Sequence, residues 1–339
     1  MNWAYVGQLE SGSTSAMRLD ALVEQIGAKP KIIIDISQEL RSDFIVWRWL
    51  AWRFKTGPTV RRIGKRILRE LGDDELDMCW FDKASFIPLE AIVFARKRVK
   101  KMVHYTPDPA IVFHKSRDFV QAIPHFDFLI TTKSYEKRLY EQLKSKKGVV
   151  ILTQQGIDDT VHKNYVQFRQ KHKAVSFIGH AEPNRMQVVD RLLKSGIPVH
   201  LAGRGWKSFA TIRKKRFEGL LCYAGEGFYG EEYGQFLSSC VISLGLLSRL
   251  VPDRITTRTF EIPACGSLLV TERTDEIESI FSEDEVLYSD YGDSLVDVIK
   301  QKMADLEEVE DRIVKAMTKV HAHYTWRRLM GELVGEVQK

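Results

Sequence analysis

Short apolar runs recur along this chain and alternate with longer stretches of helical periodicity. The segment from Lys31 to Ser37 reads Lys-Ile-Ile-Ile-Asp-Ile-Ser, and similar runs begin near Asn2, Leu76, Ala174 and Cys240. A nearly continuous apolar run of this length is typical of a strand in a parallel sheet that helices cover on both faces. The 339 residues are enough for two cores. The alternation therefore predicts an α/β fold with two Rossmann-like domains.

The composition is that of a soluble globular protein, with 44% apolar and 28% charged residues. No apolar run approaches the roughly 18 residues of a membrane-spanning helix, and the N-terminus lacks a charged region followed by an apolar one. The four cysteines are far apart and form no Cys-x-x-Cys motif, so we expect buried thiols in a reducing compartment. These features favour a cytoplasmic protein.

Positive charge is concentrated in one segment. From Arg41 to Glu70 there are nine Lys or Arg residues and two acids, whereas the whole chain has a net charge of +6. We expect a long or broken helix from Asp43 to Leu71, interrupted by a Gly-Pro pair, with Trp47, Trp49 and Trp52 among the basic residues. Such a helix suits an anionic membrane surface or a lipid-linked phosphate. Two alternatives are aromatics packed on the sheet beneath solvated arginines, and a nucleic-acid surface, although no recognition motif accompanies the charge.

A second informative stretch runs from Pro252 to Glu272 and reads as loop, short helix, turn and buried strand. Thr257 suits the N-cap of the helix and Gly266 its C-terminal stop. Ser267 to Thr271 is an apolar run of strand type.

Charged side chains crowd the start of this short helix. A helix N-terminus offers free backbone N–H groups to a phosphate, and Arg254 and Arg258 would add charge-assisted donors. Asp253 and Glu261 are acceptors that suit the hydroxyls of a sugar. Together these residue types predict a nucleotide-sugar site. The alternative is that Arg258 and Glu261 are a solvated helix pair and Asp253 a turn former.

The same stretch resembles the C-terminal domain signature of GT-B glycosyltransferases of the spore-maturation type. The residues that carry the resemblance are Arg258, Phe260, Glu261, Ala264 and Gly266. It implies two Rossmann-like domains facing a cleft, with a C-terminal helix crossing back to the N-terminal domain. Related retaining enzymes have a Glu-x7-Glu pair for the donor sugar and its ribose, which Asp253 and Glu261 match in spacing, and Thr259 joins the donor-binding set. Pro263 departs from the pattern and should kink or shorten the helix.

The N-terminus reads as strand, glycine loop and helix. Gly12, Ser13 and Thr14 lie at the start of that helix, and Arg18 follows one turn later. By the resemblance, this loop lies across the domain cleft from the donor diphosphate, and these four residues contribute to donor binding. The alternative is an ordinary strand-to-helix turn that a Ser or Thr caps.

His104 and Asp108 are the candidate catalytic residues of the first half. Both follow or end an apolar run, and the carboxyl ends of parallel strands border the ligand crevice. Either could orient or deprotonate an acceptor hydroxyl. A hydrogen-bonded loop histidine and an aspartate turn before Pro109 are the alternatives.

In the second half, Arg185 follows Phe-Ile-Gly and Arg204 lies in Gly-Arg-Gly-Trp. Both patterns resemble the same family, which implies contacts with the donor phosphates or base, unless both arginines are surface charges. Gly225 to Gly230 fits the dinucleotide fingerprint G-x-G-x-x-G, but no acid stands about 20 residues on to hold a ribose, so we do not expect NAD. His321 and His323 are two apart on a helix and make a poor metal pair.

The predicted domains are residues 1–165 on the acceptor side, 166–320 for the nucleotide sugar, and 321–339 as the returning helix. We expect a glycosyltransferase that uses a nucleoside-diphosphate sugar and a glycan or lipid-linked acceptor, with no cofactor and no nucleic-acid partner. No Asp-x-Asp occurs, so no metal is expected. The Asp-x7-Glu spacing implies retention of configuration, and the basic segment implies peripheral attachment to the inner face of the membrane. A sugar-nucleotide epimerase or hydrolase and a non-catalytic membrane-binding module are the rival functions.

Overall fold

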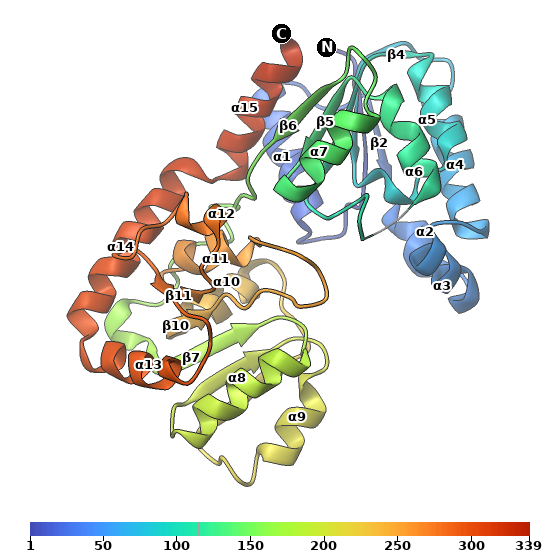
Figure 1. Ribbon diagram of the computed structural model, residues 1–339. Helices are drawn as coiled ribbons and strands as arrows, with labels where there is room; N and C mark the ends of the chain where they lie inside the picture. Colours follow the sequence, from blue (N-terminus) through green and yellow to red (C-terminus); the bar gives the residue numbers. More distant parts are fainter. Residues whose placement is uncertain (114–115) are drawn as a thin grey trace. The chain divides into compact units, whose positions relative to one another are not determined.

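The computed structural model describes residues 1–113 and 116–339, which divide into two compact units (Figure 1). Unit 1 comprises Met1–Gln154 and Trp326–Lys339, and unit 2 comprises Gln155–Thr325. The division comes earlier than residue 165 because the segment after Gln155 is tied to unit 2. The backbone N–H groups of Tyr165 and Val166 donate to the Ser238 hydroxyl at 2.9 and 3.0 Å.

The described strands of unit 1 form a parallel sheet in the order β2-β1-β3-β4-β5-β6. They are β1 (Trp3–Gly7), β2 (Ile32–Asp35), β3 (Leu76–Asp82), β4 (Val99–Thr106), β5 (Phe128–Thr131) and β6 (Val149–Leu152). The order reverses between β1 and β3, so the carboxyl ends of these strands define the expected ligand crevice. The apolar run at β2 is not buried on both faces as predicted, because β2 is an edge strand and Ile33 is 46% exposed.

The helices of unit 1 follow from capping and amphipathic patterns. They are α1 (Thr14–Ile26), α2 (Ser37–Ser42), α3 (Ile45–Phe54), α4 (Pro58–Leu71), α5 (Leu89–Arg96), α6 (Arg117–Ala122), α7 (Ser134–Leu143) and α15 (Trp326–Gln338), with short 3₁₀ turns at Ala84–Phe86 and Ile123–His125. The expected break within the basic segment lies at Lys55–Gly57, where Lys55 has a φ of 54° and Gly57 a φ of 101°. Pro58 then starts α4, since its missing N–H costs nothing in the first turn.

Unit 2 repeats the architecture with a parallel sheet in the order β12-β11-β10-β7-β8-β9 for its described strands. These are β7 (His172–Ile178), β8 (Val199–Ala202), β9 (Leu221–Gly225), β10 (Cys240–Leu244), β11 (Leu268–Thr271) and β12 (Leu287–Tyr288). Its helices are α8 (Pro183–Lys194), α9 (Trp206–Arg213), α10 (Gly230–Ser238), α11 (Arg258–Ala264), α12 (Asp275–Glu278), α13 (Ser294–Ala304) and α14 (Leu306–His323), with a 3₁₀ turn at Phe168–Gln170. The order reverses between β7 and β10, and open α/β sheets bind ligands at such a reversal. Of the cysteines expected to be buried, Cys222 on edge strand β9 is exposed.

The chain ends in unit 1, where α15 lies along α1 (Figure 1). Arg327 pairs with Glu24 at 3.1 Å, and Lys101 donates to the backbone carbonyl of Val337 at 2.6 Å. The predicted α/β class and the return of the last helix to the first domain are confirmed. No described helix has the length and apolar character needed to cross a membrane.

Candidate functional site

Two arginines meet at the carboxyl ends of β7 and β10, where the strand order of unit 2 reverses. Arg258, the first residue of α11, donates from Nη1 to the Ile178 carbonyl at 2.7 Å and from Nη2 to the Leu246 carbonyl at 3.3 Å. Arg185 of α8 donates from Nη2 to the same Leu246 carbonyl at 3.1 Å. Both guanidinium groups lie over the Phe177 ring, with centroid distances of 5.5 and 5.6 Å. We call Arg185 and Arg258 the arginine pair.

The arginine pair creates a local excess of positive charge. Burial and the charge of Arg258 lower the pKa of Arg185 to about 10, so Arg185 remains charged at neutral pH. Glu182 forms an ion pair with Arg185 at 2.7 Å. Burial and the charges of three arginines, among them Arg204, nevertheless lower the pKa of His180 below its ordinary value. His180 is therefore mostly neutral at pH 7, and a bound anion would relieve the repulsion between the guanidinium groups.

Glycines allow this close approach. A side chain on Gly179 would place its Cβ 2.3 Å from Nη1 of Arg258, and one on Gly203 would lie 2.0 Å from the Gly179 carbonyl oxygen. Gly203 also has a φ of 124°, which residues with side chains rarely adopt. Trp206 holds the turn by donating from Nε1 to the Gly179 carbonyl at 2.9 Å. The Phe-Ile-Gly and Gly-Arg-Gly-Trp patterns thus build the turns that pack around the arginine pair.

Glu261 faces the protein interior from α11 and is 4% exposed. Tyr233 of α10 donates its hydroxyl to Oε2 of Glu261 at 2.6 Å, and Nε2 of His162 lies 3.7 Å from Oε1. Burial and the Glu261 charge raise the pKa of Tyr233 well above its ordinary value, so the phenol stays a donor. Tyr233 and His162 were not predicted from the sequence. Their contacts with Glu261 cross long stretches of chain and have no local signature.

Around the start of α11, two predictions need correction. Thr257 has helical backbone angles and makes no side-chain capping hydrogen bond, so it is not the side-chain N-cap we expected. Thr259 is fully buried and accepts from the backbone N–H of Thr256 at 3.4 Å, which fits loop anchoring rather than donor binding. Pro263 agrees with a shortened helix, since α11 ends at Ala264.

The other predicted donor-side residues of unit 2 lie in the turn after β8 and in the loop before α11. Arg204 is exposed in the turn after β8, and its charge contributes to the lowered pKa of His180. Arg254 is exposed in the loop before α11, where its carbonyl accepts from the Thr274 hydroxyl at 2.8 Å. Asp253 is half-buried beside it.

In unit 1, Arg18 is a structural residue and not a ligand contact as predicted. It is fully buried and binds Asp82 through two hydrogen bonds, Nε to Oδ2 at 2.8 Å and Nη2 to Oδ1 at 2.9 Å. Tyr105 and Trp326 cover its guanidinium at 4.6 and 5.1 Å from their ring centroids. The ion pair therefore joins α1, β3, β4 and α15, and no part of it is open to a ligand.

The loop before α1 has the plainer geometry that we held as the alternative. The Ser13 hydroxyl accepts from the Ala16 N–H at 3.2 Å, which is a standard helix cap, and donates to the Gln8 carbonyl at 3.1 Å. Gly12 has a φ of 73°, so a glycine is needed in this turn. Thr14 is the first residue of α1.

His104 cannot serve as the predicted catalytic base in this conformation. Its ring is fully buried among Phe119 and Phe126, at 4.6 and 5.4 Å between centroids, and neither ring nitrogen has a partner among the described residues. Burial lowers the pKa of His104 to about 3, so the side chain is neutral at physiological pH. A histidine enclosed in this way contacts neither solvent nor substrate.

Asp108, in contrast, borders a crevice at the carboxyl ends of β1, β3 and β4. Its carboxylate is 45% exposed and pairs with Lys83 at 3.0 Å. The crevice has a volume of about 60 Å³ and is lined by Gln8, Trp52, Lys83, Ser85, Phe86, Thr106 and Asp108. Of the two catalytic candidates in unit 1, only Asp108 is placed where a ligand could reach it.

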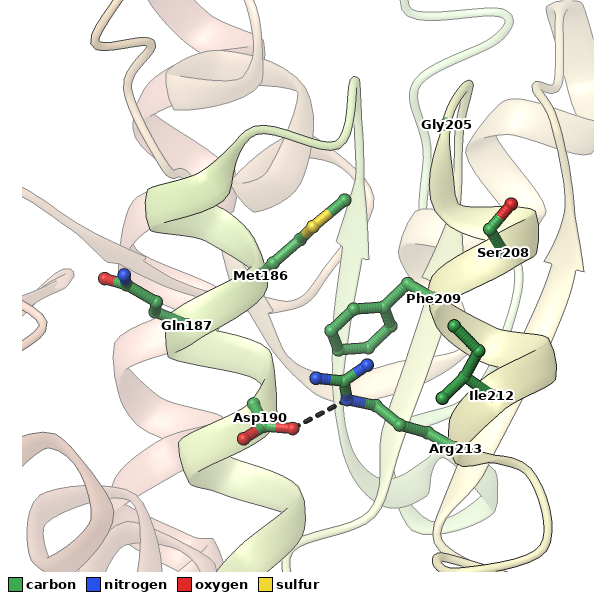
Figure 2. Close-up of a pocket in the computed structure, with 8 residues that line it drawn as sticks. All are labelled: Met186, Gln187, Asp190, Gly205, Ser208, Phe209, Ile212 and Arg213. Carbon is green, nitrogen blue, oxygen red and sulfur yellow. Dashed lines mark hydrogen bonds and ion pairs between the residues drawn. The ribbon is translucent and has the colours of Figure 1, made fainter.

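A larger cavity, of about 330 Å³, lies between α8 and α9 (Figure 2). Met186, Phe209 and Ile212 contribute apolar walls, and Arg213 is neutralised by Asp190 at 2.6 Å. The lining of this cavity supplies one arginine and its counter-ion, whereas the arginine pair has two guanidinium groups, one of which is paired with Glu182, and is the better anion site. Among the described residues, no group of three or more His, Cys, Asp or Glu side chains could hold a metal ion.

Comparison with known proteins agrees with this architecture. Residues 184–335 match the family described as glycosyl transferase-like. Three structures are similar over the whole chain. HepE from Anabaena, in complex with UDP and glucose, has 12% identity, a TM-score of 0.64 and coverage of 100% of both chains. Sucrose-phosphate synthase from Thermosynechococcus elongatus has 12% identity, a TM-score of 0.69 and coverage of 100% of this chain and 98% of its own.

The third is an alpha-glucosyltransferase in complex with UDP-glucose and DNA containing an abasic site, with 13% identity and a TM-score of 0.68, covering 100% of this chain and 99% of its own. No curated protein matches by sequence. The likeness to the solved structures gives the fold, which is GT-B, and the resemblance read from the sequence motifs is confirmed.

Proposed function

We propose that this chain, a GT-B-type glycosyltransferase by its fold and by the family match of residues 184–335, transfers a sugar from a nucleoside-diphosphate sugar to an acceptor hydroxyl. The observation that carries the proposal is the arginine pair at the strand-order reversal of unit 2. Similar structures are described as complexes with UDP or UDP-glucose, which supports a nucleotide-sugar donor.

The arginine pair suits the diphosphate. Two guanidinium groups fixed by backbone carbonyls need no rearrangement when negative charge develops on a departing nucleoside diphosphate. Leaving-group stabilisation by Arg185 and Arg258 supports a reaction that needs no bound metal, since charge neutralisation is the task a metal would otherwise perform.

Glu261 suits the hydroxyls of the donor ribose. A carboxylate can accept several hydrogen bonds, and the Tyr233 hydroxyl occupies one site on Oε2. Tyr233 therefore fixes the carboxylate and leaves acceptor capacity on Oε1. We assign Asp253 to the donor sugar on the Asp-x7-Glu spacing, and the same resemblance supports retention of configuration at the transferred carbon.

Asp108 is the proposed acceptor-side group. Its exposed carboxylate beside Lys83 can orient an acceptor hydroxyl in the crevice at the ends of β1, β3 and β4. The acceptor is a glycan or a lipid-linked sugar, for which the neighbouring Trp52 and Phe86 provide apolar surface.

Thermal unfolding in the presence of UDP, GDP, CDP and dTDP tests the donor site, because a ligand that binds only the native state raises the unfolding midpoint. We expect one nucleotide to raise the midpoint of the wild-type protein, and the shift to be lost in Arg258→Met. Sugar-nucleotide turnover with and without acceptor then separates transfer from hydrolysis. If none of the four nucleotides changes the midpoint, the proposal is wrong.

A further inference from the structure

Helix α3 (Ile45–Phe54) leaves almost all of its apolar side chains exposed. Phe44 and Ile45 are 78% and 79% exposed, Trp49 is 58% exposed, and Ala51 is the helix residue that is fully buried. The alternative in which the aromatics pack on the sheet is therefore wrong. A helix that is apolar on most of its circumference is normally buried, so α3 has the character of an element whose partner lies outside the chain.

The charge around α3 is almost entirely positive. Exposed cations flank the apolar side chains on α3 and on the outer face of α4, namely Arg48, Arg53, Arg61, Lys65 and Arg69. The acids of this region are already engaged: Arg62 and Thr59 bind Asp43, whose side chain is 5% exposed, and Arg66 binds both Glu39 and Glu70. We call the exposed residues of α3 and α4, with Phe44, the α3–α4 surface.

We propose that the α3–α4 surface docks unit 1 on an anionic lipid bilayer. Tryptophan and phenylalanine partition into the headgroup region of a membrane, where nearby Lys and Arg contact anionic headgroups. In this arrangement Phe44, Ile45 and Trp49 enter the interface while Arg61 and Lys65 remain at the level of the phosphates.

The charge pattern favours a bilayer over the other partners that an apolar face could take. In a symmetric dimer through α3, two copies of the same basic surface would face each other, and like charges would oppose association. Nucleic acid would use the cations and could stack on Trp49. It would leave Ile45 and Val46, which are 79% and 56% exposed, without a suitable contact.

Trp52 connects this surface to the candidate acceptor crevice. Its ring packs edge-on against Phe86 at 4.8 Å, and both residues line the crevice that contains Asp108. A docked α3 would hold this crevice beside the membrane, which favours an acceptor that is itself anchored in the bilayer. This last step rests on the proposed function, whereas docking itself does not.

Vesicle binding of the full chain tests the proposal. We expect sedimentation with vesicles of phosphatidylcholine mixed with phosphatidylglycerol but not with phosphatidylcholine alone, and quenching of tryptophan fluorescence by bromine-labelled lipid tails. Binding should fall by about tenfold or more in Ile45→Gln/Trp49→Gln and in Arg61→Gln/Lys65→Gln. Nucleotide-induced thermal shifts should be unchanged in both variants, which separates this proposal from the donor site.

Matched changes on unit 2 provide the control. Ile212 is 76% exposed on α9 and Lys214 and Lys215 are exposed next to it, so Ile212→Gln and Lys214→Gln/Lys215→Gln should bind vesicles as the wild type does. Unchanged vesicle binding in the α3–α4 variants would overturn the proposal. So would a dimer that dissociates in Ile45→Gln/Trp49→Gln without any vesicle binding, or oligonucleotide binding that depends on Arg61 and Lys65 alone.

Discussion

Replacing Arg258 with methionine tests the arginine pair most directly. The substitution keeps an apolar stem over Phe177 but removes the donors to the carbonyls of Ile178 and Leu246 and the charge next to Arg185. A hydrogen bond to a charged group contributes about 1.5–3 kcal/mol. Loss of one such bond to a diphosphate should therefore weaken nucleotide binding by about tenfold to a hundredfold. Isothermal titration calorimetry with the nucleotide identified by thermal shift measures the change.

The same substitution has a second consequence that needs no ligand. The charge of Arg258 contributes to the lowered pKa values of Arg185 and His180, because a nearby cation disfavours the protonated state. Removing this charge should move the pKa of His180 upward. An NMR titration of the His180 ring in wild type and Arg258→Met measures the shift directly.

Two further variants make the result decisive. Arg258→Lys keeps the charge but lacks the planar fork, so it should recover the lowered pKa of His180 and only part of the affinity. Arg216→Met removes an exposed arginine of unit 2 and should change neither quantity. If Arg258→Met binds nucleotide as the wild type does while the pKa of His180 rises, Arg258 serves the fold alone and the donor-site reasoning is refuted.

Three other substitutions address the remaining buried polar groups. Glu261→Gln keeps the shape and a partner for Tyr233 but removes the charge, so donor turnover should fall about tenfold to a hundredfold with little change in the unfolding midpoint; normal turnover would contradict the assignment. Asp82→Asn leaves Arg18 without its counter-charge, and urea unfolding of unit 1 should show a loss of about 3–5 kcal/mol; a loss below about 1 kcal/mol would show that the ion pair contributes little. Because the folded-state pKa of His104 is about 3 and its ordinary value is 6.5, the unfolded chain binds the extra proton, and the stability from the neutral ring is lost as the pH falls from about 6.5 towards 3. At pH 5 the lost stability amounts to about 2 kcal/mol. His104→Phe should therefore reduce the difference in the free energy of urea unfolding between pH 7 and pH 5. An equal difference in the wild type and the variant would argue against a buried neutral His104.

The existence of the strands could be read from the sequence, but their place in the sheet could not. Apolar runs mark β2 and β6 as clearly as the central strands, yet both are edge strands, with Ile33 46% and Val149 46% exposed. An apolar run reports that a segment is extended and faces other apolar groups. The order of strands is decided by which crossover helices cover which face, and no local pattern contains that information.

The predictions of site residues also depended on whether a local sequence pattern fixes the position of the side chain. The place of Arg185 and Arg258 in the fold was predictable because glycine motifs and helix starts fix where their backbone lies, and their contact with a donor stays a prediction. His104 was misassigned because a position near the end of a strand does not say whether helices and neighbouring rings cover the side chain. On β4, Tyr105 stacks on Trp80 while His104 points to the face covered by Phe119 of α6. Both side chains are fully buried, whereas Thr106, the last residue of β4, lines the crevice that contains Asp108.

Polar contacts between residues far apart in the sequence explain the remaining errors of prediction. In α3, by contrast, apolar side chains stay exposed. Arg18 meets Asp82 and Glu261 meets Tyr233 across separations of 64 and 28 residues, so the partner that neutralises each charge is known only once the sheet is assembled. Packing of the α3 aromatics on the sheet was one alternative from the sequence, and in unit 1 Trp49 and its neighbours are not covered. Burial of a charge and exposure of an aromatic both oppose the intrinsic preference of the side chain. A buried charge and an exposed aromatic side chain each therefore require a compensating contact. For Arg18 and Glu261 this contact lies inside the fold. For α3, the vesicle experiment tests whether the contact is with a membrane.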